Sequence, residues 1–150
     1  MQFSSKNMSF VARLLGFAGL IPFVALAALS FAVSSERRAL LVSSLLAYGV
    51  TIVSFLGAIH WGLTMVERPP RMQRLAWGVV PSLLGWGSLM VPVEIGLCIV
   101  AAVLFLCLVM DYKIYPQYGL GHWLGMRLVL SLVAMVCTVL PALAGLRLSA

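Results

Sequence analysis

The sequence predicts an all-α integral membrane protein, a bundle of five transmembrane helices. Hydrophobic residues make up 63% of the 150-residue chain and charged residues 9%, and the mean hydropathy is +1.09. Soluble domains are about half apolar and about a quarter charged, so lipid must solvate much of this surface. The apolar residues also gather in five long runs, and a bilayer core requires about 20 apolar residues in helical form. Because little sequence lies outside the runs, we predict a single domain, residues 1–150.

The predicted spans follow the apolar runs, at about residues 10–33, 39–66, 75–91, 95–110 and 123–146. The first resembles a signal peptide in its basic start, but its apolar stretch exceeds the usual h-region of about 7–15 residues, so we interpret it as a span. The second is long enough to tilt or protrude. Only residues 92–94 join the third span to the fourth, which makes these two helices antiparallel neighbours. Three prolines should bend their helices: Pro22, Pro81 and Pro141.

Basic residues predict the orientation. We call the membrane face that holds the N-terminus side X and the opposite face side Y. Side X receives seven of the ten basic residues: Lys6, Arg13, Arg68, Arg71, Arg74, Lys113 and Arg127. Side Y receives Arg37, Arg38 and Arg147. The positive-inside rule then predicts an N-in/C-out protein with side X in the cytoplasm, or in the matrix of a mitochondrion. An odd number of spans also argues against two equal inverted repeats.

Small residues recur at helical spacing in four of the runs. In lipid, small residues mark the places where helices approach closely. The candidate contact faces are Ala47, Thr51, Ser54 and Ala58; Gly78, Ser82 and Gly85; Gly16 and Gly19; and Gly121 with Gly125. Together they favour a compact bundle over a set of separate anchors.

Several short motifs resemble a known family. The segment Ser54–Gly62 reads SFLGAIHWG, Leu15–Phe23 reads LGFAGLIPF, and Pro81–Trp86 reads PSLLGW. With Asp111, Trp123 and Arg127 further on, they resemble a family of small polytopic bacterial inner-membrane proteins. That family is classed as a domain of unknown function and has an animal mitochondrial transmembrane counterpart. The resemblance covers roughly residues 14–130. It implies a multi-pass protein of the bacterial inner membrane and brings no activity with it.

Most residues that could support chemistry fall at side X. Because ionisable groups inside a membrane are costly, they are treated first as candidates for function. The candidates for ligand or partner binding are His60, Trp61, Asp111, His122, Trp123 and Arg127. We predict no catalytic residue and no metal site. The cysteines form no metal-binding pattern and are interpreted as small buried hydrophobic residues: Cys98, Cys107 and Cys137.

Asp111 and Arg127 form a predicted structural ion pair. They lie on consecutive helices, each about one turn inside side X. An unpaired charge of this kind costs about 2.5–3.5 kcal/mol near the centre of a span and less near its end, so pairing would offset much of the cost. The alternative is an arginine that binds an anion or a lipid headgroup. Trp123 could cover the guanidinium of Arg127, and Ser131 continues the same helix face into the bundle.

The two histidines have several interpretations. We expect His60 to point into the bundle, where Gly57 leaves room, either as a hydrogen-bonded structural residue or as a ligand-binding or proton-handling group. His122 and Trp123 could instead be interfacial anchors, as we expect for Tyr112, Tyr115 and Tyr118. Ligation of one haem by His60 and His122 is a weak alternative. Glu67, Arg68 and the two following prolines predict a rigid interfacial loop.

Three classes of function remain open. The sequence lacks Walker, HExxH, GxSxG and dinucleotide-binding motifs, so it favours a non-catalytic protein without excluding an enzyme. Scattered basic residues argue against nucleic-acid binding.

Small size predicts an accessory or assembly component of a membrane complex, with the lipid bilayer and other inner-membrane proteins as partners. The alternative is a binder of an amphipathic ligand, a quinone or lipid, at side X. A small transporter or channel comes third, because no polar path crosses the spans. No cofactor is predicted, and quinone, lipid and haem are the alternatives.

Overall fold

The computed structural model describes residues 10–67 and 69–149, and the regular structure in these residues is entirely helical. The elements in chain order are α1 (Phe10–Ala18), α2 (Ile21–Ser30), α3 (Ser35–Met65), α4 (Met72–Ser88), α5 (Val93–Ile114), the 3-10 turns η1 (Tyr115–Tyr118) and η2 (Gly121–Trp123), and α6 (Leu124–Ser149). This confirms the predicted helical membrane bundle. Lys6 and Arg68, both used in the orientation argument, lie outside the described residues.

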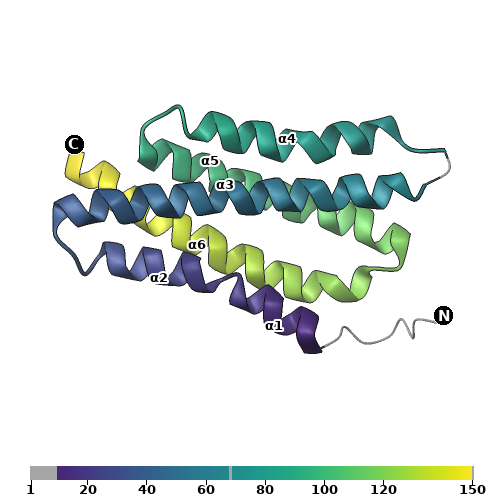
Figure 1. The fold of residues 1–150 in the computed structure, drawn as a ribbon, viewed down its shortest axis with the longest axis horizontal. Helices are drawn as coiled ribbons and strands as arrows, with labels where there is room; N and C mark the ends of the chain where they lie inside the picture. Colours follow the sequence, from purple (N-terminus) through teal and green to yellow (C-terminus); the bar gives the residue numbers. More distant parts are fainter. Residues whose placement is uncertain (1–9, 68, 150) are drawn as a thin grey trace.

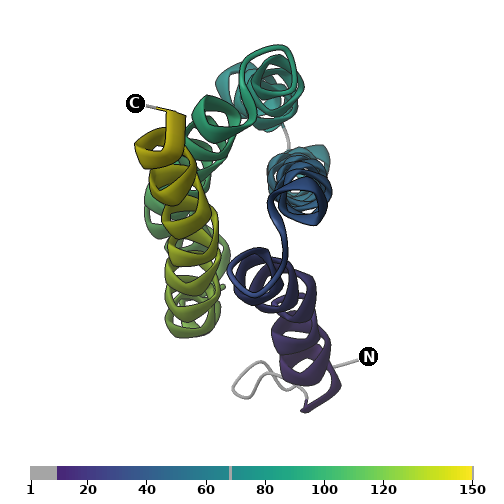
Figure 2. The same cartoon turned by 90° about the vertical axis from the view of Figure 1, so that its left-hand side faces the viewer.

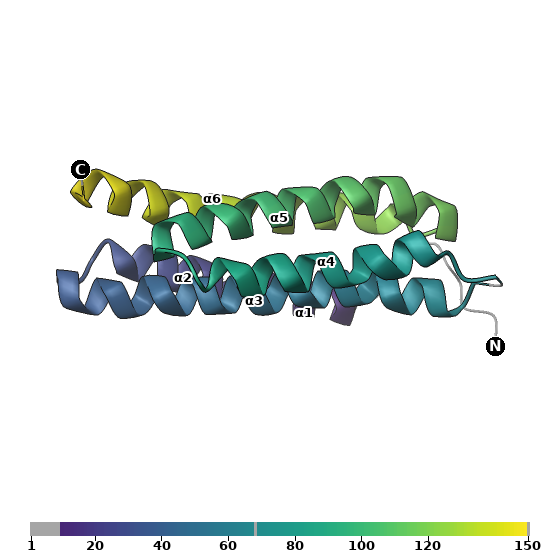
Figure 3. The same ribbon diagram turned by 90° about the horizontal axis from the view of Figure 1, so that it is seen from above.

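The helices form two layers. Figure 3 shows α5 and α6 in one layer and α1 to α4 in the other. Viewed along the bundle, α4 and α1 lie at opposite ends of the arrangement (Figure 2). The starts of α1, α4 and α6 and the ends of α3 and α5 share one end of the molecule, which corresponds to side X (Figure 1). The candidate residues around the ends of α3 and α5 and the start of α6 therefore lie near one face.

Four segments of the described chain are long and apolar enough to cross a membrane: Phe10–Ser30, Ser35–Met65, Val93–Tyr118 and Gly121–Arg147. The remaining helix, α4, has 17 residues. At 1.5 Å per residue it is about 25 Å long, slightly shorter than a bilayer core of about 30 Å. It packs along α3 and returns the chain to the end where α5 begins (Figure 1). The chain thus traverses the bundle five times.

The first traverse is two helices instead of one bent helix. Helix α1 ends at Ala18 and α2 begins at Ile21, so the break precedes Pro22. Proline is tolerated in a first helical turn because the missing N–H has no intrahelical partner there. The hydroxyl of Tyr48 on α3 donates a 2.8 Å hydrogen bond to the carbonyl of Gly19 at the break. Pro81 and Pro141, in contrast, lie inside the continuous helices α4 and α6.

Several helix boundaries differ from the predicted spans. Helix α3 begins at Ser35 instead of residue 39, and α4 occupies Met72–Ser88 instead of 75–91. Helix α5 continues four residues beyond the predicted end at 110, which places Asp111 inside the helix. The earlier starts of α3 and α4 and the later end of α5 share one cause: the apolar run marks the part of a helix in contact with lipid, whereas backbone hydrogen bonding continues through polar residues at the interface. The end of α4 at Ser88 does not follow from it, because residues 89–91 are apolar.

Helices α3 and α4 approach closely through glycine. A Cβ added at Gly57 would collide with the carbonyl oxygen of Gly78, and one added at Gly78 would collide with the indole of Trp61. Gly85 likewise has Val50 and Val53 of α3 within 3.2 Å of a virtual Cβ. The predicted small-residue face of the third span is therefore a real helix contact.

Two of the other predicted contact faces are wrong. Ala47, Thr51 and Ala58 are exposed, and the buried side of α3 runs instead through large residues and glycines: Val42, Leu45, Leu46, Gly49, Val53, Leu56, Gly57, His60 and Thr64. A Cβ at Gly121 or Gly125 would meet nothing within 4 Å. Small residues mark a contact only when another helix faces them, and in apolar sequence such spacings also occur on lipid-facing sides.

The orientation of the bundle is a first testable prediction. We expect reporter fusions after Ser35 and after Ala150 to read as periplasmic, and one after Arg71 as cytoplasmic, because side X carries the basic excess in short loops. Alkaline phosphatase and fluorescent-protein fusions expressed in a bacterial host would measure this. Opposite readings at Ser35 and Ala150 would contradict five traverses, and inversion of all three would contradict the N-in orientation.

Candidate functional site: a buried His-Asp-Arg cluster beside an apolar cavity

Asp111 links three helices. Its side chain, on α5, is 1% exposed. One carboxylate oxygen, Oδ1, lies 3.0 Å from Nε2 of His60 on α3. The other, Oδ2, accepts a 2.7 Å hydrogen bond from Nε of Arg127 on α6 and lies 2.6 Å from Nη2 of the same arginine. The carboxylate therefore holds α3 and α6 against α5 from inside the bundle.

Local sequence positions the ring of His60. Gly57, one turn earlier, lets α4 approach the same part of α3. The ring is 1% exposed and lies 6.1 Å, centroid to centroid, from Tyr115. Because an ionised carboxylate only accepts hydrogen bonds, the tautomer with its hydrogen on Nε2 fits Asp111 best. The negative charge of Asp111 and the positive charge of Arg127 cancel within their ion pair.

Three buried polar atoms in this region lack a hydrogen bond to the described protein: Nδ1 of His60, Nη2 of Arg127 and Oγ of Ser131. The contact between Nη2 and Asp111 is close enough for charge attraction but lacks hydrogen-bond alignment. Since Nη2 carries two N–H groups, at least one remains available for another acceptor. Buried polar atoms are normally paired, so three unpaired atoms near one cluster require an explanation.

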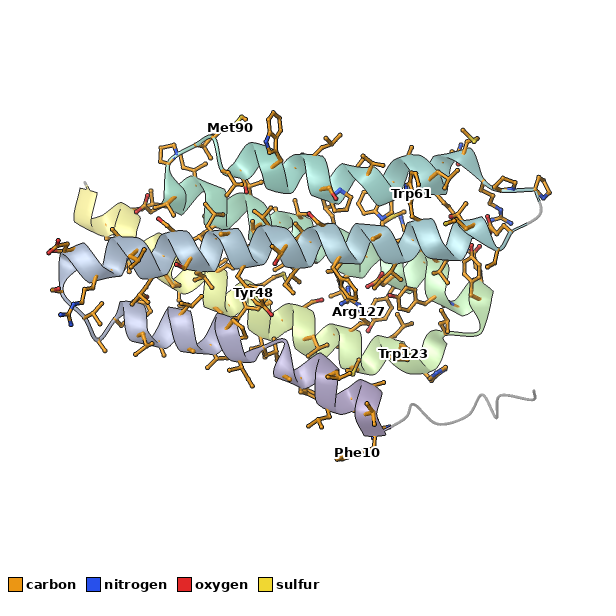
Figure 4. The ribbon with its side chains drawn as sticks, in the orientation of Figure 1. Phe10, Tyr48, Trp61, Met90, Trp123 and Arg127 are labelled. Carbon is orange, nitrogen blue, oxygen red and sulfur yellow. The ribbon has the colours of Figure 1, made fainter. Side chains whose placement is uncertain are left out.

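Two adjoining apolar pockets, both partly open at the surface of the bundle, lie beside the cluster, and we call them the two chambers of one cavity. The larger chamber, of about 500 Å³, lies toward side X between α1, α3, α6 and the loop before α6. The smaller, of about 220 Å³, lies deeper in the bundle and includes Ser131 in its wall. Both chambers share five residues: Leu15, Gly16, Phe55, Arg127 and Leu130. Arg127 is the only charged residue in either described lining, and Figure 4 shows it pointing inward from α6.

The other sequence candidates lie elsewhere. Trp61 is 43% exposed and lies between α3 and α4 (Figure 4), where its Nε1 donates a 2.6 Å hydrogen bond to the carbonyl of Leu75. His122 is exposed, and its ring lies 6.0 Å from that of Trp123. Trp123 lines the larger chamber together with Arg127. Asp111 engages Nε2 of His60, whereas His122 is exposed, and haem ligation by these two histidines stays a prediction.

Tyr115 is not an interfacial anchor. It is 4% exposed and lies beside His60 and in the wall of the larger chamber. The 3-10 turn η1 begins at Tyr115, directly after the end of α5, and Tyr115 is its buried residue. Residues of α1 also enter the cavity wall. Neither Tyr115 nor the residues of α1 were predicted to belong to the site. For Tyr115 the reason is that an aromatic residue in an apolar context looks the same at an interface and in a core.

A second polar cluster joins the two side X loops. Arg74, at the start of α4, donates hydrogen bonds to Glu67, Gln117 and Tyr118. The hydroxyl of Tyr118 donates a 2.7 Å hydrogen bond to Oε1 of Glu67, and the guanidinium of Arg74 lies 5.2 Å from the centroid of the Tyr118 ring. Sequence analysis counted Arg74 only as a topology signal. A clue to this cluster was Glu67, the acidic residue of the loop before α4.

Acid should weaken this loop cluster. The hydrogen bond from Tyr118, the backbone N–H of Arg71 and the nearby charges of Arg74 and Arg71 hold the pKa of Glu67 below its ordinary value of 4.5. A lowered folded-state pKa stabilises the fold above the ordinary value, and that stabilisation is lost as pH falls through the lower one. We therefore expect Tyr118→Phe to be less stable than the parent near neutral pH, with a difference that shrinks below about pH 4.

Thermal unfolding in detergent across this pH range would measure the effect of Tyr118→Phe. Tyr112→Phe, at an exposed tyrosine of the same helix end, is the matched control and should show no pH-dependent difference. A gap between the Tyr118 variant and the parent that stayed constant in acid would contradict the role of Glu67.

These features define a multi-pass helical membrane protein with a buried polar cluster and an adjacent apolar cavity. The chain belongs to the family described as "Protein of unknown function (DUF3429)", which matches residues 8–143. It is 32% identical over 125 residues to Transmembrane protein 69 of Xenopus tropicalis, an alignment that covers 81% of this chain and 49% of that protein. It is 28% identical over 123 residues to Transmembrane protein 69 of Mus musculus, covering 79% and 50%. The chain thus spans about half the length of these relatives. No solved structure matches it.

Proposed function

We propose that this protein binds an amphipathic ligand of the quinone or lipid class in the two-chambered cavity. The observation that carries the proposal is that two buried donors, on Arg127 and Ser131, lack hydrogen-bond partners beside a cavity whose lining is otherwise almost entirely apolar. Ligand pockets typically combine an apolar lining with a few polar groups that orient the ligand. A molecule with one polar end and an apolar body matches both features.

The unpaired donors on Arg127 and Ser131 carry an energetic cost. Leaving a buried polar group without a hydrogen bond costs about 1–3 kcal/mol. Arg127 and Ser131 are four residues apart on α6 and therefore share one helix face. An acceptor placed between them would recover part of the cost at both positions, and the apolar body would contact Leu15, Phe55 and Leu130.

The setting is the cytoplasmic half of a bacterial inner membrane, with side X inside. Support for this comes from the excess of basic residues on side X. A role as an accessory or assembly component of a membrane complex stays a prediction, and ligand binding is compatible with it. Transport receives less support, because the polar groups of the cavity gather at one end of the bundle and no charged residue lines its deeper part beyond Arg127.

Ligand co-purification tests the proposal. We expect the protein purified in mild detergent to retain an amphipathic molecule at near-stoichiometric amount, identified by mass spectrometry of an organic extract. Leu130→Trp should abolish retention, because Leu130 lines both chambers and the larger side chain would fill them.

Leu132→Trp is the matched control, since Leu132 lies two residues further on the same helix and is 48% exposed. It should retain the ligand at the parent level. An extract with no enriched amphiphile, or equal retention by the two tryptophan variants, would refute binding in this cavity.

A further inference from the structure

We infer that the ligand carries an uncharged hydrogen-bond acceptor, a carbonyl of the quinone or ester kind, as its polar end, and not a phosphate or carboxylate. This inference rests on the proposed function and names the class of ligand within it. It follows from three features of the site: its net charge, the type of its free polar groups and their depth.

The charge of Arg127 is already balanced. Its guanidinium is in contact with the ionised partner Asp111, at 2.6 and 2.7 Å, and it is the only charged residue in the described lining of the cavity. An anionic head would therefore place a second negative charge next to a neutral pair. Burying an uncompensated charge is far more costly than burying a hydrogen-bonded neutral group. The neutrality of the Asp111–Arg127 pair therefore disfavours an anionic ligand, even though an arginine lines the cavity.

The unpaired polar atoms of the residues that line the cavity are donors. Arg127 has only N–H groups, and the hydroxyl of Ser131 has a hydrogen to donate. Both residues are at least nine-tenths buried, at 8% and 2% exposure. Neither Nη2 of Arg127 nor Oγ of Ser131 makes a hydrogen bond to the described protein, and Nη2 also contacts Asp111 at 2.6 Å. A carbonyl oxygen has two lone pairs and can accept from both at once. The pair of donors thus matches one neutral carbonyl.

Depth supports the same conclusion. Arg127 lies about one turn inside the start of α6, and Ser131 lies one turn deeper. Between Arg127 and the loops, the larger chamber is lined by apolar and aromatic side chains such as Leu120, Trp123 and Met126. A phosphate head would have to lose its hydration to pass or occupy this rim, whereas a carbonyl loses much less.

The test compares three ligands with tails of similar length: decylubiquinone, monodecanoyl glycerol and decyl phosphate. Binding to the purified protein would be measured by isothermal titration calorimetry in mild detergent. We expect at least one of the two carbonyl ligands to bind about tenfold or more tightly than decyl phosphate. The quinone and glycerol ester arms distinguish the two sources of the carbonyl.

Two variants test whether charge balance and hydrogen bonding determine which ligand is preferred. Asp111→Asn leaves the charge of Arg127 unbalanced, so it should strengthen decyl phosphate binding by about tenfold without strengthening carbonyl binding. Ser131→Ala keeps the ion pair intact, and it should weaken the carbonyl ligand while leaving decyl phosphate unchanged. Glu67→Gln removes an acidic group outside the cavity lining and is the charge control, expected to change neither.

The outcomes distinguish a failure of the neutral polar end from a failure of the cavity as a binding site. Equal or tighter binding of decyl phosphate to the parent protein would overturn the neutral head and leave the cavity as a binding site. If Asp111→Asn does not fold, an unchanged carbonyl affinity in Ser131→Ala would by itself overturn the inference. No binding of any of the three ligands, together with no amphiphile in the organic extract, would remove the proposed function as well.

Discussion

Breaking the buried ion pair is expected to destabilise the protein by about 3–5 kcal/mol, whether by Asp111→Asn or by Arg127→Gln. Each single change strands the partner's charge in the bundle interior, where Asp111 is 1% and Arg127 8% exposed. The aspartate change also weakens the hydrogen bond to His60. The double variant should lose clearly less than the sum of the two single losses, because no uncompensated charge then remains. Unfolding in detergent, analysed as a double-mutant cycle, measures this coupling.

Arg71→Gln is the matched control for the buried pair. Arg71 also faces an acidic residue, Glu67, but at 3.9 Å and with 63% of its side chain exposed. Exposed pairs contribute about 0–1 kcal/mol, so this variant should stay near the parent. Additive losses at Asp111 and Arg127 would show that the two side chains do not act as a unit.

A side chain at Gly57 is expected to separate α3 from α4. A Cβ there would collide with the backbone carbonyl of Gly78, which cannot move aside as a flexible side chain could. We expect Gly57→Ala to cost about 1–3 kcal/mol, as is typical of overpacking, and Gly57→Leu to cost more. Thermal unfolding in detergent would measure both losses.

The control for Gly57 lies five residues further along the same helix. A Cβ at Gly62 would meet nothing within 4 Å, so Gly62→Ala should be neutral or stabilising by up to about 1 kcal/mol, because alanine favours the helix. If the alanine variants at Gly57 and Gly62 behaved alike, the close approach of α3 and α4 would be wrong.

Much of the architecture follows from the sequence because it depends on local composition. Apolar runs of sufficient length can only be accommodated as spans, and short connections make consecutive spans antiparallel. This reasoning predicted the helical bundle and the common membrane side of Asp111 and Arg127. It also predicted that these two residues would pair, since they lie on consecutive helices and an unpaired charge in a span is costly. The structure places the two side chains in contact.

Only the tertiary structure decided which helix faces are buried, because lipid removes the contrast between apolar buried faces and polar exposed faces on which prediction from sequence depends. In water, an apolar face marks the buried side of a helix; in a membrane both sides are apolar, so the exposed Ala47 and Ala58 looked like a contact and the buried Tyr115 like an anchor. His60 and Asp111 are 51 residues apart, and nothing local specifies that pairing. The cavity needs side chains from α1, α3 and α6 together. A void of this kind exists only once the helices have packed, since it is the space that their side chains leave unfilled.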